Sequence, residues 1–155
     1  MEKLKRFGIE DNDYQQGAVY GVAHVYFLIS REIENYLKPF NLNPTSFNAL
    51  MIIKHQGKED GISQIDIGKR LVVTASNMTK LLDKLNNEAL IERSAQKGDR
   101  RVNLIKITKK GSDLLDQAWP GYKGTIDEIT GLLEKKELEG LTQILAKWFD
   151  GLENL

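Results

Sequence analysis

The chain has 155 residues, of which 41% are hydrophobic and 28% are charged, and its 22 basic residues balance its 22 acidic ones. This composition is typical of a globular domain and excludes an intrinsically disordered chain. The absence of cysteine excludes structural disulfides, thiol-based sensing and cysteine-rich zinc sites, and it fits a reducing compartment such as the cytoplasm. No signal peptide and no membrane-spanning segment is expected, because the start is charged and the most apolar run is too short.

Long helices are expected at both ends of the chain. Apolar residues recur every three or four positions over 13–38, which predicts one helix that Pro39 ends. A similar seam continues through Pro120, so a kinked helix is predicted there, and the seam returns in a last helix from about Glu134. A small domain cannot cover such seams alone. The segments 13–38 and 117–155 are therefore predicted to be dimerisation helices that pair two copies of the chain.

Shorter helices are predicted between these ends from their start signals. Asn43 followed by a proline predicts the start of the second helix. Ser63 and Asp66 match a capping box, and the third helix is expected to continue to about Leu71. Thr74 is expected to cap the fourth helix after a tight turn.

A small β-hairpin is expected after the fourth helix. The segments 91–94 and 102–107 are rich in β-forming residues, and the loop between them is predicted to span 95–101. A very short strand is expected near 61–62, and Thr108 is expected to cap the following helix. The predicted fold class is mainly α with a small β-wing, a winged helix-turn-helix domain flanked by long N- and C-terminal dimerisation helices.

The charge is unevenly distributed although its sum is zero. Between Ser63 and Lys110 there are 11 basic and 5 acidic residues, a net charge of +6 that leaves −6 on the rest of the chain. A basic middle between acidic flanks is the pattern of an element that binds a polyanion. For the charge alone, an ordinary solvated surface is the alternative interpretation.

The fourth predicted helix has one apolar and one polar face, as expected for the second helix of a helix-turn-helix. In the DNA major groove, Asn77 is suited to pair with adenine and Lys80 with guanine. The hydroxyl groups of this helix are better suited to phosphates, with help from its positive N-terminus. The DNA-binding residues predicted on this helix are Thr74, Ala75, Ser76, Asn77, Thr79, Lys80 and Lys84.

The hairpin loop carries the second set of DNA-binding candidates, Lys97, Arg100 and Arg101. Arg100 and Lys97 are expected to approach the minor groove, whose negative potential attracts cationic side chains. Asp99 is not expected to contact DNA, because phosphate repels a carboxylate. We expect it to form a salt bridge with Arg101 that stabilises the wing.

With these features, the chain resembles the MarR (multiple antibiotic resistance regulator) family of winged helix-turn-helix transcription factors. The resemblance covers 42–115 as the DNA-binding region, and the whole chain, 1–155, fits a single domain of this kind. Ala89 departs from the family, which usually has glycine at this position. The residues that carry the resemblance are 71–85, 89–93, the Asp-Arg-Arg motif 99–101 and the Ile-Thr-x-x-Gly motif 107–111.

The resemblance implies a homodimer that binds double-stranded DNA at a pseudo-palindromic operator, usually as a repressor and often released by a small aromatic acid or another ligand. In this family, ligands tend to lie between the dimerisation helices and the DNA-binding region. Arg31 is of particular interest, because a buried guanidinium would need a carboxylate partner. For each pocket candidate, ordinary core packing is the alternative. The candidates are Tyr20, His24, Phe27 and Arg31 from the first helix, and Phe47 and Met51 from the second.

Three other functions fit the sequence less well. A winged helix that serves only as a protein-interaction module, without specific DNA binding, would not need the basic middle. A metal-responsive regulator would need acidic ligands beside His24 and His55, the only histidines, and none can be identified. An enzyme is not expected, because the sequence has no glycine-rich phosphate loop, nucleophile elbow or apolar carboxylate pair. No catalytic residue, metal site or cofactor is therefore predicted.

Overall fold

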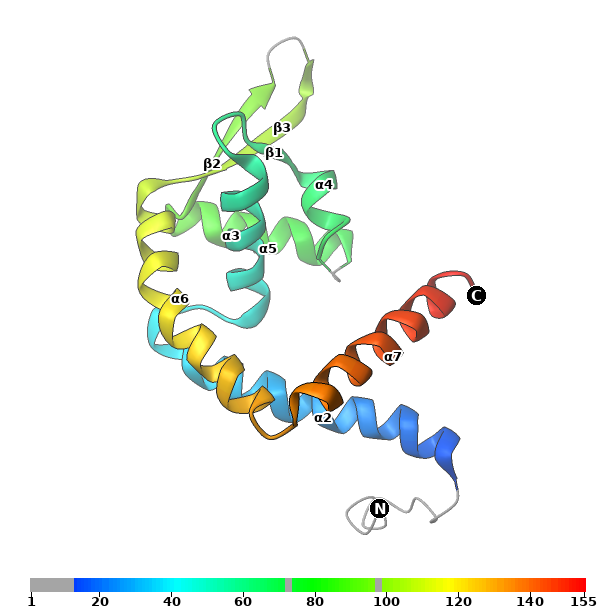
Figure 1. Cartoon of the computed structure of the whole chain (residues 1–155). Coiled ribbons are helices and arrows are strands. Elements are labelled where there is room, and N and C mark those ends of the chain that lie inside the picture. Colours follow the sequence, from blue (N-terminus) through cyan, green and yellow to red (C-terminus); the bar gives the residue numbers. More distant parts are fainter. Residues whose placement is uncertain (1–12, 72–73, 97–98) are drawn as a thin grey trace.

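The computed structural model of the protein describes residues 13–71, 74–96 and 99–155 (Figure 1). At one end lies a head, which we define as α3, α4, α5 and the three strands, while α2 and α7 extend away from it and α6 connects the two parts. The elements are α2 (Tyr14–Leu37), the 3-10 turn η1 (Lys38–Phe40), α3 (Pro44–Gly57), β1 (Ile62–Ser63), α4 (Gln64–Gly68), α5 (Ala75–Asn87), β2 (Ile91–Gln96), β3 (Asp99–Ile107), α6 (Lys109–Thr130) and α7 (Lys135–Glu153).

The predicted fold class is confirmed, and helix starts lie where the capping residues placed them. Asn43 Oδ1 accepts a hydrogen bond from the Ser46 N–H at 2.8 Å at the start of α3. Thr74 and Thr108 cap α5 and α6 with their side chains. The helix α6 continues through Pro120 as predicted, and Figure 1 shows that its axis bends along its length.

The short helix α4 differs from the prediction at both ends. Ser63 Oγ accepts from the Asp66 N–H (3.1 Å), but the Asp66 carboxylate accepts from the Ser63 hydroxyl (2.7 Å) instead of a backbone N–H. The aspartate is one methylene shorter than the glutamate of a full capping box. The helix ends at Gly68 rather than near Leu71, and the chain then closes one more turn, in which the Arg70 and Leu71 N–H groups both bond to the Ile67 carbonyl and Leu71 is buried.

The three strands form an antiparallel sheet in the order β1-β3-β2. Ile62 of β1 pairs with Ile105 of β3, so the short strand expected near 61–62 is confirmed as the edge of this sheet. The hairpin strands are longer than predicted, because pairing continues to Ala95 with Asn103 and to Gln96 with Asp99. Backbone hydrogen bonds alone support such pairing. The expected loop 95–101 was therefore too long.

The core of the head forms around α3. Phe47, Leu50 and Ile53 of this helix are at most 1% exposed. They share one hydrophobic cluster with Leu82 of α5 and Ile105 of β3. Burying each such side chain contributes about 1.5–3 kcal/mol to folding, so these contacts fix how α5 and the sheet lie relative to α3.

Helices α2 and α6 are joined where both leave the head. The Tyr36 hydroxyl donates to the Ala118 carbonyl at 2.7 Å, although the two residues are far apart in the sequence. Beside this bond, the rings of Phe47 and Tyr122 lie 4.4 Å apart between centroids. Partial burial raises the pKa of Tyr122 above its usual value, as expected for a phenol that packs against the core. This joint connects the long helices to the head.

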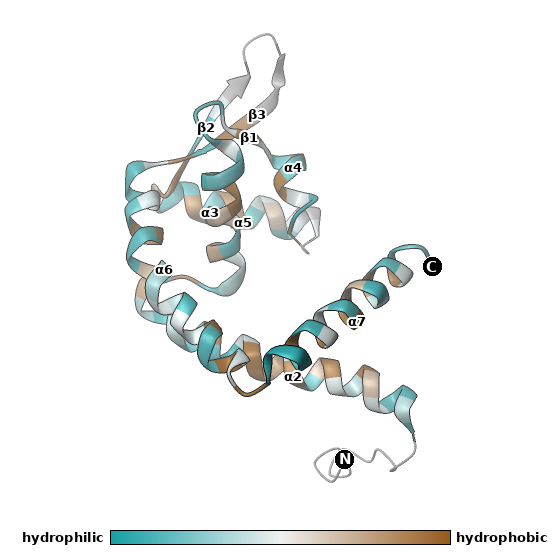
Figure 2. Ribbon diagram, in the orientation of Figure 1, coloured by the Kyte–Doolittle hydropathy of each residue, from teal (hydrophilic) through white to brown (hydrophobic). Residues whose placement is uncertain are grey.

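Hydrophobic residues of α2 and α7 lie at the surface away from the head (Figure 2). Between the two helices is a groove of about 710 Å³ whose lining is apolar apart from Thr142 and Asp150. Within the described ranges, no helix combines the length and the apolar character that crossing a bilayer requires. The exposed apolar residues on these two helices include Val19, Val22, Val25, Phe27, Leu141, Ile144, Leu145, Phe149 and Leu152.

The Thr-x-x-Gly motif fixes the start of α6 against the end of α5. Thr108 Oγ1 donates to the Ala89 carbonyl at 2.8 Å and accepts from the Gly111 N–H at 3.0 Å. Gly111 is buried, and a Cβ atom at this position would collide with the Leu90 carbonyl oxygen. The motif is therefore required by the close contact between the two chain segments.

The end of α5 explains the departure at Ala89. The Leu90 N–H bonds to the Leu85 carbonyl and the Ala89 N–H bonds to the Asn86 carbonyl, both at 2.9 Å, which is a Schellman motif. Ala89 has φ of 56°, in the left-handed region that favours glycine. Alanine is therefore strained here.

Replacing this alanine, Ala89→Gly, is expected to raise the free energy of unfolding by about 1 kcal/mol, because glycine adopts the left-handed conformation without a Cβ penalty. Urea unfolding followed by circular dichroism measures the change. The control is Ala23→Gly, at an exposed position inside α2. This variant is expected to lower the free energy of unfolding by about 1 kcal/mol. A destabilised Ala89→Gly variant would contradict the strain.

Candidate nucleic-acid interface

Helix α5 separates its residues into a buried and an exposed face. Met78, Leu82 and Leu85 are at most 3% exposed and pack into the core of the head. The opposite face is left open because nothing else in the described chain covers it. The exposed side chains on α5 and its cap include Thr74, Ser76, Asn77, Thr79, Lys80, Asp83 and Lys84.

The N-terminus of α5 presents hydroxyl groups beside its free backbone N–H groups. Thr74 Oγ1 accepts from the Asn77 N–H and lies 3.4 Å from Ser76 Oγ. Helix N-termini carry partial positive charge and attract anions such as phosphate. The backbone of Ala75 is helical, but its side chain lies outside the described residues. The predicted recognition residues thus lie together on one helix, with Lys80 near its middle.

No pattern in the sequence predicted the ion pair between Arg93 and Asp83. An Arg93 Nη2 donates to Asp83 Oδ1 at 2.7 Å, linking β2 to the exposed side of α5. Both side chains are partly exposed, so the pair contributes about 1 kcal/mol or less to stability. Its main effect is geometric, because it ties the hairpin to α5 and pairs a carboxylate that would otherwise repel an anion.

Helix α4 is also hydrogen-bonded to α5. Gln64 Nε2 donates to Thr79 Oγ1 at 3.3 Å. In α4 itself, the hydrogen bond from Ser63 lowers the pKa of Asp66 below its usual value, and Lys69 adds to this effect at 3.1 Å. Lys69 is therefore paired within α4, whereas Arg70 donates to the Asp66 carbonyl.

The wing is placed only in part. Asp99, Arg100 and Arg101 lie in strand β3 rather than in a loop, and Gln96 pairs with Asp99. The side chains of these three residues, and the whole of Lys97, lie outside the described residues. Their contacts with DNA and the Asp99–Arg101 salt bridge therefore remain predictions.

The six residues predicted to form a ligand pocket do not come together in the described chain. Phe47 is 1% exposed and belongs to the core, whereas Tyr20 and Phe27 are exposed on α2. Arg31 is not buried; it pairs with its neighbour Glu32 at 2.9 Å. His24 Nδ1 lies 2.8 Å from the Tyr20 carbonyl on the same helix. In the described chain this face of α2 does not meet α3, so the Arg31 guanidinium is exposed, and its role in a ligand pocket remains a prediction.

A cavity of about 470 Å³ lies instead between α2, α3 and the end of α4. Of the six predicted residues, it contains only Met51. The other lining comes from the neighbouring face of α2, including Tyr26 and Ile33, and from Arg70 beyond α4. Both of these α2 residues belong to the apolar seam of α2, which was predicted to serve dimerisation alone.

Metal binding has little support in the part of the chain that the structure places. No three His, Cys, Asp or Glu side chains in the described ranges lie close enough together to hold a metal ion. His55 is exposed near the end of α3 and lies on a different helix from His24.

Comparisons with known proteins identify this arrangement. The sequence model of the MarR family matches residues 42–102. The HTH-type transcriptional regulator MhqR of Bacillus subtilis (strain 168) is 31% identical over 126 residues, which are 81% of this chain and 85% of that protein. The chain belongs to the MarR family. Members of the MarR family are transcriptional regulators, so the protein is a regulator of transcription and not an enzyme.

Solved structures of MarR-family proteins share the fold. AbsC from Streptomyces coelicolor superposes with a TM-score of 0.84 at 20% identity, over 95% of this chain and 99% of that one. A MarR mutant from E. coli complexed with operator DNA gives 0.78 at 24% identity, over 89% and 98%. The S. aureus MepR–DNA complex gives 0.79 at 22% identity, over 86% and 96%. At these identities, the likeness shows the fold alone.

Proposed function

We propose that this MarR-family protein is a homodimeric repressor of transcription that binds a pseudo-palindromic operator in double-stranded DNA. The observation that carries the proposal is the open polar face of α5, which is held outward by the burial of Met78, Leu82 and Leu85. A helix with such a face fits the major groove, and its N-terminal side chains then reach base edges.

Each part of the proposed interface has its own task. Asn77 and Lys80 read bases, while the hydroxyls of Thr74, Ser76 and Thr79 contact phosphates beside the helix N-terminus. Lys84 extends the contact along α5. Lys97, Arg100 and Arg101 of the wing bind along the backbone and minor groove, and Asp99 stabilises the wing.

Relatives with the same fold support DNA as the partner. The E. coli MarR mutant was crystallised with operator DNA, and S. aureus MepR was crystallised with DNA. A partner of this kind would place the protein with the chromosome, in the cytoplasm of a bacterial cell.

The uncovered apolar faces of α2 and α7 support a homodimer. Val19 and Val22 of α2 and Leu145, Phe149 and Leu152 of α7 line one apolar groove, and all of them are more than 40% exposed in the single chain. Monomeric proteins rarely expose an apolar patch that combines two helices in this way. A second copy, with its own terminal helices, is the occupant that a symmetric interface requires.

Release by a small aromatic or other hydrophobic ligand is the regulatory part of the proposal. The cavity beside Met51 supports it, because apolar α2 and α3 side chains line it together with Arg70, which follows α4. A ligand in this cavity touches both a proposed dimerisation helix and the helix-turn-helix. It changes the DNA affinity only if it binds one spacing of the two heads more tightly than the other.

The variants Asn77→Ala and Lys80→Ala are each expected to lose about 1–3 kcal/mol of binding free energy, because each removes a contact with a base edge. Specificity is expected to relax at one base position per half-site. Fluorescence anisotropy with operator DNA selected by the wild-type protein, and with single-base variants of it, measures both effects.

A matched control is Lys123→Ala. Lys123 is exposed on α6 and makes no ion pair with any described residue, so its loss is expected to leave affinity and specificity unchanged. Equal losses for Lys80→Ala and Lys123→Ala would contradict the assignment of α5 as the reading helix. Wild-type protein that binds no DNA at any salt concentration would contradict the proposed function.

The dimer is tested by Leu145→Glu, which puts a carboxylate into the apolar groove between α2 and α7. The variant is expected to be a monomer where the wild type is a dimer, because burying an unpaired charge costs several kcal/mol. Light scattering after size exclusion measures the mass. Gln143→Glu, at an exposed α7 position two residues away, is the control and is expected to remain dimeric. A monomeric wild type would contradict the proposed homodimer.

A further inference from the structure

A polar recess lies where the end of α2, the turn η1 and the start of α3 meet α5. Its volume is about 280 Å³. Lys38, Asn41 and Asn43 line it from the turn region, Glu34 and Asn35 from the last turn of α2, and Lys84 from α5. Neither the helix-turn-helix nor the wing includes the turn residues, and the recess shares only Lys84 with the predicted DNA-binding residues.

Glu88 connects α5 to this turn. The Asn41 side-chain amide donates to Glu88 Oε1 at 3.3 Å, and Lys84 Nζ lies 3.9 Å from the same oxygen. Asn41 has φ of 55°, and its N–H bonds to the Lys38 carbonyl at 3.0 Å, which closes a tight turn. The position of the recess relative to α5 is therefore set by hydrogen bonds.

The charges of the recess are not equally available. Lys84 shares the Glu88 carboxylate with Asn41. Lys38 is exposed and makes no ion pair with any described residue. Glu34 lies one helical turn before Lys38 and lines the same recess, but it is not within ion-pair distance of that lysine. The cation free to meet an external anion is thus Lys38, with Glu34 as the nearby opposing charge.

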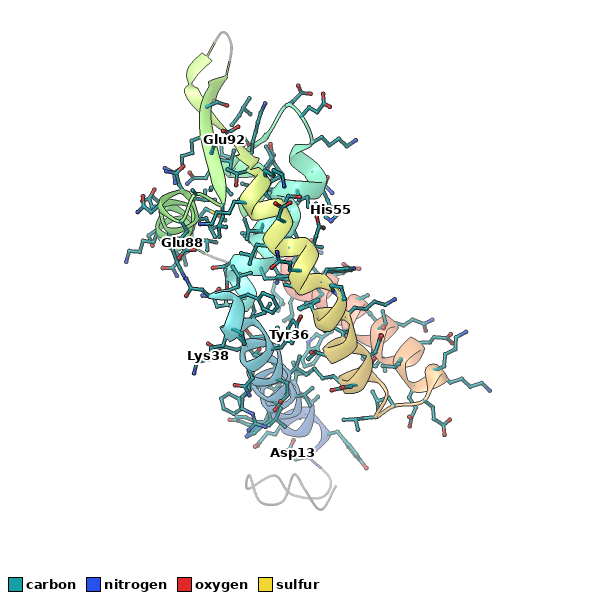
Figure 3. All side chains as sticks on the ribbon, turned by 90° about the vertical axis from the view of Figure 1, so that its left-hand side faces the viewer. Asp13, Tyr36, Lys38, His55, Glu88 and Glu92 are labelled. Atoms are coloured by element: carbon teal, nitrogen blue, oxygen red, sulfur yellow. The ribbon has the colours of Figure 1, made fainter. Side chains whose placement is uncertain are left out.

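The recess opens on the same side of the molecule as α5. Figure 3 labels Lys38 and Glu88 on the side where α5 projects, with the hairpin above α5 and Lys38 below it. Helix α6 lies on the opposite side in this view. The hairpin, α5 and the recess therefore follow one another along a single face.

The dimensions of DNA indicate what the hairpin, α5 and the recess can bind when they lie along one face. The major groove is about 12 Å wide, and a helix with its side chains is about 10–12 Å across. A helix in the groove therefore has a row of phosphates along each flank. The wing lies on one flank of α5, and the recess lies on the other.

We propose that Lys38, supported by Asn41 and Lys84, binds the DNA phosphates on the flank of the major groove opposite the wing. The inference rests on the proposed function, since it requires that α5 enters the groove. Lys38 then supplies a charge-assisted contact to the second phosphate row, and Glu34 weakens this contact by repulsion. The two phosphate contacts together hold α5 in register across the groove.

The test measures the affinity of the full-length dimer for its selected operator over a salt series. Lys38→Ala is expected to weaken binding about tenfold and to reduce the slope of log affinity against log salt by about 0.9 for each Lys38 in contact with a phosphate. Lys38→Arg, which keeps the charge, is expected to bind like the wild type. Glu34→Gln is expected to bind more tightly and with no loss of base specificity, an effect that a purely structural role for the recess does not produce.

Lys123→Ala is again the control on the opposite side, and circular dichroism confirms that each variant is folded. Ethylation interference on the operator measures which phosphates each protein needs for binding. On the flank away from the wing, ethylation of some phosphates is expected to weaken binding of the wild type but not of Lys38→Ala. If the wild type binds with a steep salt slope while Lys38→Ala matches it in affinity and slope, the inference is overturned and the proposed function stands. If the wild type binds no DNA, both fall.

Discussion

The packing of α5 against α3 sets the geometry of the DNA-binding head, because the residues that α5 buries decide which residues it can expose. Leu82 and Leu85 are completely buried, so the opposite face of the helix has to point outward. The Schellman motif at Ala89 and the Thr108 bond to its carbonyl then fix the direction in which the chain leaves α5. The polar face of α5 is therefore preorganised by core contacts.

The long helices place the head. The hydrogen bond between Tyr36 and the Ala118 carbonyl joins α2 to α6 at the base of the head, and the apolar faces of α2 and α7 lie beyond it. In a dimer that forms through those faces, a small change in the angle between α2 and α6 changes the distance between the two heads. The cavity between α2 and α3 lies between one of these long helices and the head.

Local patterns in the sequence predicted the elements well, and they failed where distant residues decide the outcome. The helix starts at Asn43 and Thr74 depend on hydrogen bonds within three residues, and the polar face of α5 follows from its own periodicity. The longer hairpin strands and the Asp83–Arg93 pair depend on partners in other elements, for which the sequence has no periodic signal. The ligand-pocket residues remain a prediction, because the sequence alone does not show which face of α2 meets α3.

Selection of binding sites from random duplex DNA tests the central claim most directly. A symmetric dimer that places one α5 in each of two successive major grooves predicts an enriched inverted repeat, with half-site centres about 10 bp apart and affinity that falls steeply with salt. Enrichment of a single unrepeated site, or salt-sensitive binding without any enriched sequence, would contradict the claim that two identical helices read the operator one DNA turn apart.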